Sequence, residues 1–150
     1  MDQLERAEID DILCQVLRTI YHYERSIAMN YGLDFQQIYA LQYLRRHPDA
    51  RLTDIAAEME LPKIAVSRLI SHLIDAGILS KSQDLVDRRN YPIQLEASGE
   101  QVLQVIETAS FQHITANLEG FPQMAVTKLV GQAKQMHIVL GVTDKVIQQP

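Results

Sequence analysis

Polar side chains recur at helical spacing between Pro62 and Gly77, in the middle of the chain. At 100° per residue, one side of this segment is apolar and the opposite side carries hydrogen-bond donors. An aliphatic side chain, Ile64, lies among the donors, where a thymine methyl group would suit it better than water. The segment is a candidate for reading DNA in a major groove, although polar outer faces are also normal for surface helices. This face comprises Ile64, Ser67, Arg68, Ser71, His72 and Asp75.

A second group of charged side chains follows in a polar loop, residues 83–90. The run Asp87-Arg88-Arg89 lies between two short stretches typical of strands, 78–82 and 91–95. A hairpin would hold these arginines at its tip, where the negative potential of a narrow DNA groove attracts them. Asp87 would direct one arginine by accepting its hydrogen bonds. A surface ion pair worth ~0–1 kcal/mol is the alternative, but a polar helix followed by a basic tip favours DNA binding.

Helices must position most of these side chains. Apolar residues repeat every three or four positions over residues 9–20, which predicts an amphipathic helix over about 5–31. Asp34 and Gln37 have the spacing of a capping box and predict a second helix. The pair His47-Pro48 is expected to end it, because the residue before a proline disfavours helical backbone.

The segment that follows predicts two more helices joined by a tight turn. The first is expected over residues 54–59 with Thr53 as its N-cap. The second should have Pro62 at its first helical position and should end at Gly77.

Beyond the hairpin the pattern becomes helical again. Ser98 and Gln101 form a second capping-box pair, and Gly120-Phe121-Pro122 should end the helix that they open. A last helix is expected over 126–140, where apolar residues again repeat at helical spacing.

This order predicts a mainly α fold with a small β-hairpin, a winged helix-turn-helix over about residues 34–96. Flanking helices over about 5–31 and 98–147 carry apolar stripes outside that module. Stripes of this length need a partner surface, and a second copy of the chain is the commonest solution, so they are expected to be dimerisation helices. We expect one domain over residues 1–150.

Composition excludes several classes of protein. The chain has 150 residues, 47% hydrophobic and 22% charged, which is typical of a soluble globular protein. Its net charge is −5, but residues 45–92 hold eight basic and seven acidic side chains, whereas residues 1–44 hold three and seven. A basic face is therefore possible only in the middle third. With no apolar run near ~18 residues, an acidic N-terminus unlike a signal peptide and a single cysteine, we expect a cytoplasmic protein without membrane contact.

Three runs of residues together resemble the MarR family of bacterial and archaeal transcription regulators. They are 51–56, 63–79 and 87–99, which include the helix-turn-helix pattern and the Asp-x-Arg spacing of Asp87 and Arg89. The resemblance covers nearly the whole chain. Ala97 departs from it, since the family usually has threonine there, and Ser98 is expected to cap the helix instead.

The resemblance implies a homodimer bound to double-stranded DNA at a palindromic operator. In the family, the fourth-helix positions that match Pro62, Lys63, Ser67 and Arg68 contact the major groove, and the wing arginine that matches Arg89 enters the minor groove. Two such helices would read half-sites ~10 bp apart. This implies a transcription regulator, most often a repressor.

Two kinds of signal are open as the means of release from DNA. One branch of the resembling family senses organic hydroperoxides through a first-helix cysteine bonded by tyrosines, which makes Cys14 a candidate thiol sensor. A small hydrophobic packing residue is the alternative for this cysteine. The other signal is a small aromatic or phenolic ligand between the outer helices and the winged helix. The candidate sensing residues are Cys14, Arg18, Tyr21, Arg25, Tyr39 and Tyr43.

Other classes of function lack matching motifs. The sequence has no glycine-rich phosphate loop, nucleophile elbow or His-Glu motif, so we do not expect an enzyme. Its histidines are too scattered for a metal site, and no cofactor is expected. A winged helix that binds another protein rather than DNA is the alternative function.

Overall fold

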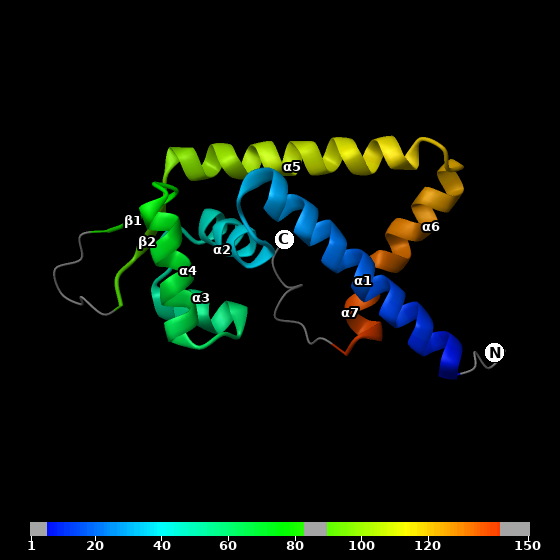
Figure 1. The fold of residues 1–150 in the computed structure, drawn as a ribbon, viewed down its shortest axis with the longest axis horizontal. Helices are drawn as coiled ribbons and strands as arrows, with labels where there is room; N and C mark the ends of the chain where they lie inside the picture. The colour runs from blue at the N-terminus through cyan, green and yellow to red at the C-terminus, as the bar shows by residue number, and fades with distance from the viewer. Residues whose placement is uncertain (1–5, 83–89, 142–150) are drawn as a thin grey trace. The chain divides into compact units, whose positions relative to one another are not determined.

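The computed structural model describes residues 6–82 and 90–141 of the chain (Figure 1). The fold is mainly helical with a two-stranded antiparallel hairpin, which confirms the predicted fold class. Two compact units divide the chain, residues 1–108 and 109–150, with the boundary inside one helix. The elements are α1 (Arg6–Tyr31), α2 (Phe35–Arg46), α3 (Leu52–Met59), α4 (Lys63–Asp75), β1 (Leu79–Lys81), β2 (Ile93–Leu95), α5 (Ala97–Leu118), α6 (Gln123–Ala133) and α7 (Met136–Val139).

The hydrophobic core of the described residues lies in the first unit, between Leu33 and Ile106. Side chains from α2, α3, α4, the hairpin and the first half of α5 meet there, so each helix buries one apolar stripe. The stripe predicted for α4 is confirmed, because Val66, Ile70 and Leu73 are all buried. The largest fully buried side chains are Leu41, Leu44, Ile55, Ile70, Leu73, Leu79, Ile93, Leu103 and Val66.

Helix α1 has the predicted apolar stripe, but none of its described residues is buried. The six aliphatic side chains of the stripe keep between 38% and 57% of their surface exposed in the single chain. The stripe therefore forms as predicted without being covered. Its residues are Ile9, Ile12, Leu13, Val16, Leu17 and Ile20.

Helix α2 begins with the predicted capping box. The Gln37 N–H donates to Asp34 Oδ1 over 2.8 Å, and the Asp34 N–H donates to Gln37 Oε1 over 2.9 Å. Both amides lie where no helical carbonyl can reach them, so the side chains satisfy them instead. The helix ends at His47, directly before Pro48, as predicted.

A charged cluster joins α2 to the first half of α5. Arg45 binds Glu107 through two hydrogen bonds, Nη1 to Oε2 at 3.0 Å and Nη2 to Oε1 at 2.6 Å. Gln42 Nε2 donates to Glu107 Oε1 over 3.2 Å, and Glu100 lies 3.5 Å from Arg45. The bonds from Arg45 hold the pKa of Glu107 below its usual range, and the bond to Glu107 raises the pKa of Arg45, because each favours the charged form of its partner.

The start of helix α3 differs from the prediction. The helix begins at Leu52, and its N-cap is Arg51, whose N–H donates to Asp54 Oδ2 over 2.7 Å. Thr53, which was predicted as the N-cap, lies inside the first turn and donates its hydroxyl to Asn90 Oδ1 over 3.1 Å. The prediction was wrong because the partner that engages Thr53 lies 37 residues away in the sequence.

The turn between α3 and α4 is made without a glycine. Glu60 has φ 52° and ψ 37°, in the left-handed region that glycine favours. Pro62 is the N-cap of α4 rather than its first helical residue, because its ψ of 139° is extended while its carbonyl accepts the Ala65 N–H over 2.9 Å. The fixed φ of proline suits both positions, so the residue type alone does not separate them.

Helix α4 ends at the predicted glycine. Gly77 has φ 71°, and its N–H donates to the Ile74 carbonyl over 2.9 Å. The Ile78 N–H donates to the Leu73 carbonyl, also over 2.9 Å, which completes a Schellman motif. This motif turns the chain directly into β1.

The hairpin strands are shorter than predicted, three residues each. β1 and β2 pair antiparallel, with Leu79 opposite Leu95 and Lys81 opposite Ile93. On its other side, β2 receives the segment before α3, since the Ile93 N–H donates to the Ala50 carbonyl over 3.0 Å. The second strand is therefore held on both sides.

The beginning of α5 corrects the second predicted capping box. The helix begins at Ala97, so Ser98 lies within its first turn, and the Ser98 hydroxyl donates to the Gly77 carbonyl over 2.6 Å. Ser98 thus ties the start of α5 to the end of α4. Gly99 allows this close approach, because a Cβ there would lie 2.6 Å from the Ile78 carbonyl oxygen.

The second unit contains the second half of α5, followed by α6 and α7. A single last helix over 126–140 was predicted, but it is interrupted at Gln135, where φ is −98° and ψ is 0°. The apolar repeat continues through the interruption, and no glycine or proline marks it. Leu129 and Ile138 keep 54% and 68% of their surface exposed. None of the helices in the described ranges is long and apolar enough to cross a membrane.

Candidate nucleic-acid interface

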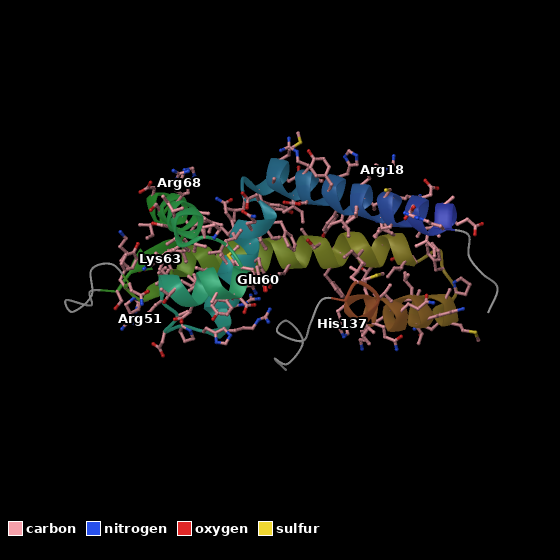
Figure 2. All side chains as sticks on the ribbon, turned by 90° about the horizontal axis from the view of Figure 1, so that it is seen from below. Arg18, Arg51, Glu60, Lys63, Arg68 and His137 are labelled. Atoms are coloured by element: carbon pink, nitrogen blue, oxygen red, sulfur yellow. The ribbon has the colours of Figure 1, made fainter. Side chains whose placement is uncertain are left out.

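Helix α4 presents a polar face opposite the stripe that packs into the core. Arg68 and His72 are exposed on this face, and Ile64 keeps 67% of its surface exposed. Lys63 is exposed at the first residue of the helix. Figure 2 shows Lys63 and Arg68 standing out from the helix. The arrangement combines cationic donors with one aliphatic contact. Ser67 and Ser71 also belong to the predicted face but are half-buried at its edge.

The positive charges of this face are not neutralised locally. Within the described part of the chain, neither Lys63 nor Arg68 forms an ion pair. No side chain caps the N-terminus of α4, where the helix dipole places partial positive charge. The amides of the first turn and the side chains of Lys63 and Arg68 together favour an anionic partner such as a phosphate.

The base of the hairpin contacts the start of α3. Arg51 Nη1 donates to the Asn90 carbonyl over 2.5 Å, and the Thr53 N–H donates to Asn90 Oδ1 over 3.3 Å. Arg51 also forms a β-bridge with Pro92. These contacts join the second strand of the wing to the helix-turn-helix, so the two possible DNA-reading elements are connected through described residues.

A further cation lies on the first strand of the hairpin. Lys81 Nζ lies 4.6 Å from the centre of the Tyr91 ring, the geometry of a cation–π contact. The lysine is exposed and the tyrosine half-buried, so the ring orients a positive charge at the side of the hairpin.

Comparison with known proteins matches the same region of the chain. The MarR family profile matches residues 31–90, from the end of α1 to the end of the hairpin loop. Over these residues, which form the winged helix, the chain is similar to the MarR family.

Relatives extend the MarR-family likeness over the rest of the chain. The HTH-type transcriptional regulator BilQ of Clostridioides difficile is 23% identical over 146 residues, 97% of both chains. The structure of a MarR family protein from Bacillus stearothermophilus covers 93% of this chain and 99% of its own, with 20% identity and a TM-score of 0.76. MarR of Staphylococcus aureus in complex with salicylate and kanamycin covers 91% and 93%, with 15% identity and a TM-score of 0.70.

The predicted DNA-contacting residues of the winged helix fall into two groups. One group begins with the N-cap of α4 and continues along that helix. The other lies on the wing at Asp87, Arg88 and Arg89, outside the described residues. The first group comprises Pro62, Lys63, Ile64, Ser67, Arg68 and Ser71.

Four of the six predicted sensing residues lie on α1. Cys14 is exposed in the single chain rather than packed away, and Arg18 Nε donates to its backbone carbonyl over 3.4 Å. Tyr21 and Arg25 are exposed too. In the parts of the chain that the structure describes, no hydrogen bond or ring contact joins the Cys14 side chain to a tyrosine.

The other two predicted sensing residues, on α2, face the helix-turn-helix instead. Tyr39 donates its hydroxyl to Glu58 Oε1 on α3 over 2.5 Å. Desolvation by burial, followed by this bond to a carboxylate, raises the pKa of Tyr39 to about 12. Tyr43 lies 4.5 Å from the His47 ring and lines a shallow hollow with Arg46 and Asp54. Arg46 therefore lies beside Tyr43 in this hollow, whereas Arg18 and Arg25 lie on α1.

The sequence analysis missed the contacts at the base of the wing. Arg51 and Thr53 were noted only for the family pattern and helix capping, and Asn90 only as the end of the loop. Their bonds connect positions 37 and 39 residues apart. One signal was available: Thr53 precedes a carboxylate, Asp54, whose spacing to Arg51 already fits an N-terminal cap and leaves the threonine hydroxyl unused.

Proposed function

We propose that this chain is a cytoplasmic, sequence-specific regulator of transcription that binds double-stranded DNA and acts as a repressor. It has no catalytic role in this proposal. Each subunit places α4 in the major groove and the wing arginine Arg89 in the adjacent minor groove. The match of residues 31–90 to the MarR family supports this proposal.

One observation carries the proposal: the exposed face of α4 has cations without ion-pair partners in the described chain, next to an uncapped helix N-terminus. The opposite face of the helix is fixed in the core by Ile70 and Leu73, which are 0% and 1% exposed. A rigidly seated helix with a free cationic face is suited to a groove, where Arg68 can bind guanine and Ile64 can contact a thymine methyl group. Lys63 and the first amides suit a phosphate.

We also propose that the active species is a homodimer on a palindromic operator. The apolar stripe of α1 and the apolar residues of α6 and α7 are exposed in the single chain. A symmetric partner would cover these surfaces and would double the phosphate and base contacts. The two copies of α4 would then read half-sites about 10 bp apart.

Release from DNA is assigned to a small aromatic or phenolic ligand or to an oxidant acting at Cys14. The Staphylococcus aureus MarR structure, which has the same fold, contains salicylate. A ligand can change DNA affinity only if it binds the two spacings of the recognition helices with different affinity. The oxidant route needs an accessible thiol, and Cys14 is exposed in the single chain.

The proposal is tested by selecting duplexes from a random pool with the full-length protein and measuring affinity by fluorescence anisotropy at several salt concentrations. Affinity should fall with a log–log slope of about −0.9 per phosphate contacted. Arg68→Ala should weaken binding by ~1–3 kcal/mol and relax base preference at one position. Arg6→Ala on α1 removes the same charge from a 96% exposed side chain away from α4 and should bind like the parent.

The wing is tested with Arg89→Ala, which should lose at least ~1 kcal/mol of affinity while the dimer stays intact. Operator binding equal to that of the parent would show that the wing assignment is wrong. A parent protein that binds no duplex at low salt would overturn the proposed function and favour a winged helix that binds protein.

A further inference from the structure

Asn90 contacts the start of α3 through both its side chain and its backbone. Its Oδ1 accepts hydrogen bonds from the Thr53 N–H, over 3.3 Å, and from the Thr53 hydroxyl, over 3.1 Å. Its backbone carbonyl accepts from Arg51 Nη1 over 2.5 Å. An amide oxygen has two acceptor sites, so the two bonds from Thr53 match its capacity.

The position of Asn90 in the chain gives these contacts a consequence. Asn90 directly follows Arg89, the wing residue to which the proposed function assigns the minor groove. Two residues later, Pro92 bridges to Arg51, and Ile93 bonds to Ala50. The chain leaving the wing loop is therefore attached to the helix-turn-helix from its first described residue onward.

Attachment at this point affects binding through entropy. A charged loop that binds DNA must lose conformational freedom, and this loss subtracts from the binding free energy. A base that is already fixed reduces the loss. The side chains of Arg51, Thr53 and Asn90 add to the backbone pairing here, and the bond from the Thr53 hydroxyl to Asn90 Oδ1 joins two of these side chains.

We propose that Asn90 is a positioning residue for the wing: its bonds to Thr53 at the start of α3 fix the residue that directly follows Arg89, and it strengthens the DNA contact proposed for Arg89 without contacting DNA itself. The inference rests on the proposed function and adds to it a residue that acts through another. It adds a side-chain link between the wing and the start of α3.

The test is a double-mutant cycle between Asn90→Ala and Arg89→Ala, measured on the operator selected by the parent. Asn90→Ala should weaken binding about threefold to tenfold in the parent, and by less than about twofold once Arg89 is alanine. The same change combined with Arg68→Ala should multiply the two separate losses. Asn90→Ala keeps the backbone bond to Arg51, so the fold should remain, and circular dichroism would verify this.

A matched pair at Thr53 gives a second route. Thr53→Ser keeps the hydroxyl and should bind DNA like the parent, whereas Thr53→Val removes it at nearly constant volume and should weaken binding in the same Arg89-dependent way. If Thr53→Val weakens binding equally with and without Arg89, the threonine contacts DNA directly and the proposal is overturned.

Hydrogen exchange of the free protein gives a readout that does not depend on DNA. The Thr53 amide should exchange faster in Asn90→Ala, while the Ile70 amide in the core should be unchanged. An unchanged Thr53 amide would overturn the contact itself. If the parent binds DNA but the cycle is additive, only the role of Asn90 fails; if the parent binds no duplex, the proposed function fails with it.

Discussion

Helices α1 and α4 have the same kind of amphipathic pattern, but the apolar stripe is buried on α4 and exposed on α1. On α4, Ile70 is 0% exposed in a core that other helices and the hairpin complete. On α1, Ile12 and Ile20 keep 53% and 56% of their surface exposed. Helical periodicity therefore determines which side of a helix is apolar. Whether that side is buried depends on the other elements, of the same chain or of a second chain, that pack against it.

The buried core and the exposed apolar surfaces lie in different parts of the chain. Residues 33–106 hold a complete core and all the described residues proposed to contact DNA. The helices α1, α6 and α7 hold no buried residue among those described. Substitutions in the core of residues 33–106 should therefore change the stability of the winged helix, whereas substitutions in the exposed apolar surfaces should change the assembly of the proposed dimer.

The largest expected effect compares two isoleucines on the same helix. Ile70→Ala removes a fully buried side chain and should lower the free energy of unfolding by about 2–5 kcal/mol. Ile64→Ala makes the same change at a position that is 67% exposed and should cost less than ~1 kcal/mol. Urea denaturation of both variants measures the difference. Equal losses would show that α4 does not separate a buried face from a free one.

The next prediction concerns the exposed stripe of α1 as a dimer interface. The double variant Ile12→Glu, Ile20→Glu places two charges in the exposed stripe, so it should convert the dimer to a monomer and weaken operator binding at least ~100-fold, as expected when two linked sites are separated. Light scattering and anisotropy measure these effects. The control, Gln15→Glu with His22→Glu, adds the same charges to the polar side. A charged stripe that leaves the dimer intact would show that α1 is not the interface.

A smaller effect concerns the cluster that joins α2 to α5. Because the pKa of Glu107 is lowered in the folded protein, its charged form stabilises the fold above the ordinary carboxyl pKa of about 4.5, and this contribution disappears as the pH falls through the lowered value. Glu107→Gln should cost ~1 kcal/mol or less at pH 7, since both side chains are about one-third exposed. The gap between parent and variant should close as the pH falls below the ordinary carboxyl pKa and through the lowered pKa of Glu107. A gap independent of pH would mean that the Arg45 bond does not set the stability of this contact.

The smallest effect expected on the free protein is that of Cys14→Ser, because the thiol makes no side-chain bond in the described chain. Stability and operator affinity should match the parent within ~0.5 kcal/mol. An organic peroxide should release the parent from DNA and leave the variant bound. Release of both proteins alike would exclude the thiol as the switch.

Local signals predicted most helix boundaries, because they act within one turn of the chain. Asp34 and Gln37 cap α2, and Gly77 ends α4, as their types and spacing indicate. Signals of the same kind failed at Thr53 and Ser98. Both hydroxyls are engaged by groups 37 and 21 residues away, namely Asn90 and the Gly77 carbonyl. A capping rule considers only neighbouring residues and does not include such competitors.

The turn of the helix-turn-helix shows a different limit. Glu60 adopts a left-handed backbone that its residue type disfavours. The packing of Leu61 against the core and the start of α4 at Pro62 require the chain to turn there. Tertiary contacts thus override a local preference that costs on the order of 1 kcal/mol.

By itself, the sequence determined the face of α4 that is buried and the resemblance of the winged helix to the MarR family, since periodicity and short motifs carry that information. Only the tertiary structure decided which distant groups meet: Arg45 with Glu107, Tyr39 with Glu58, and Asn90 with Thr53. Hydrogen bonds depend on position and direction in space, and no residue spacing along the chain specifies these for partners tens of residues apart.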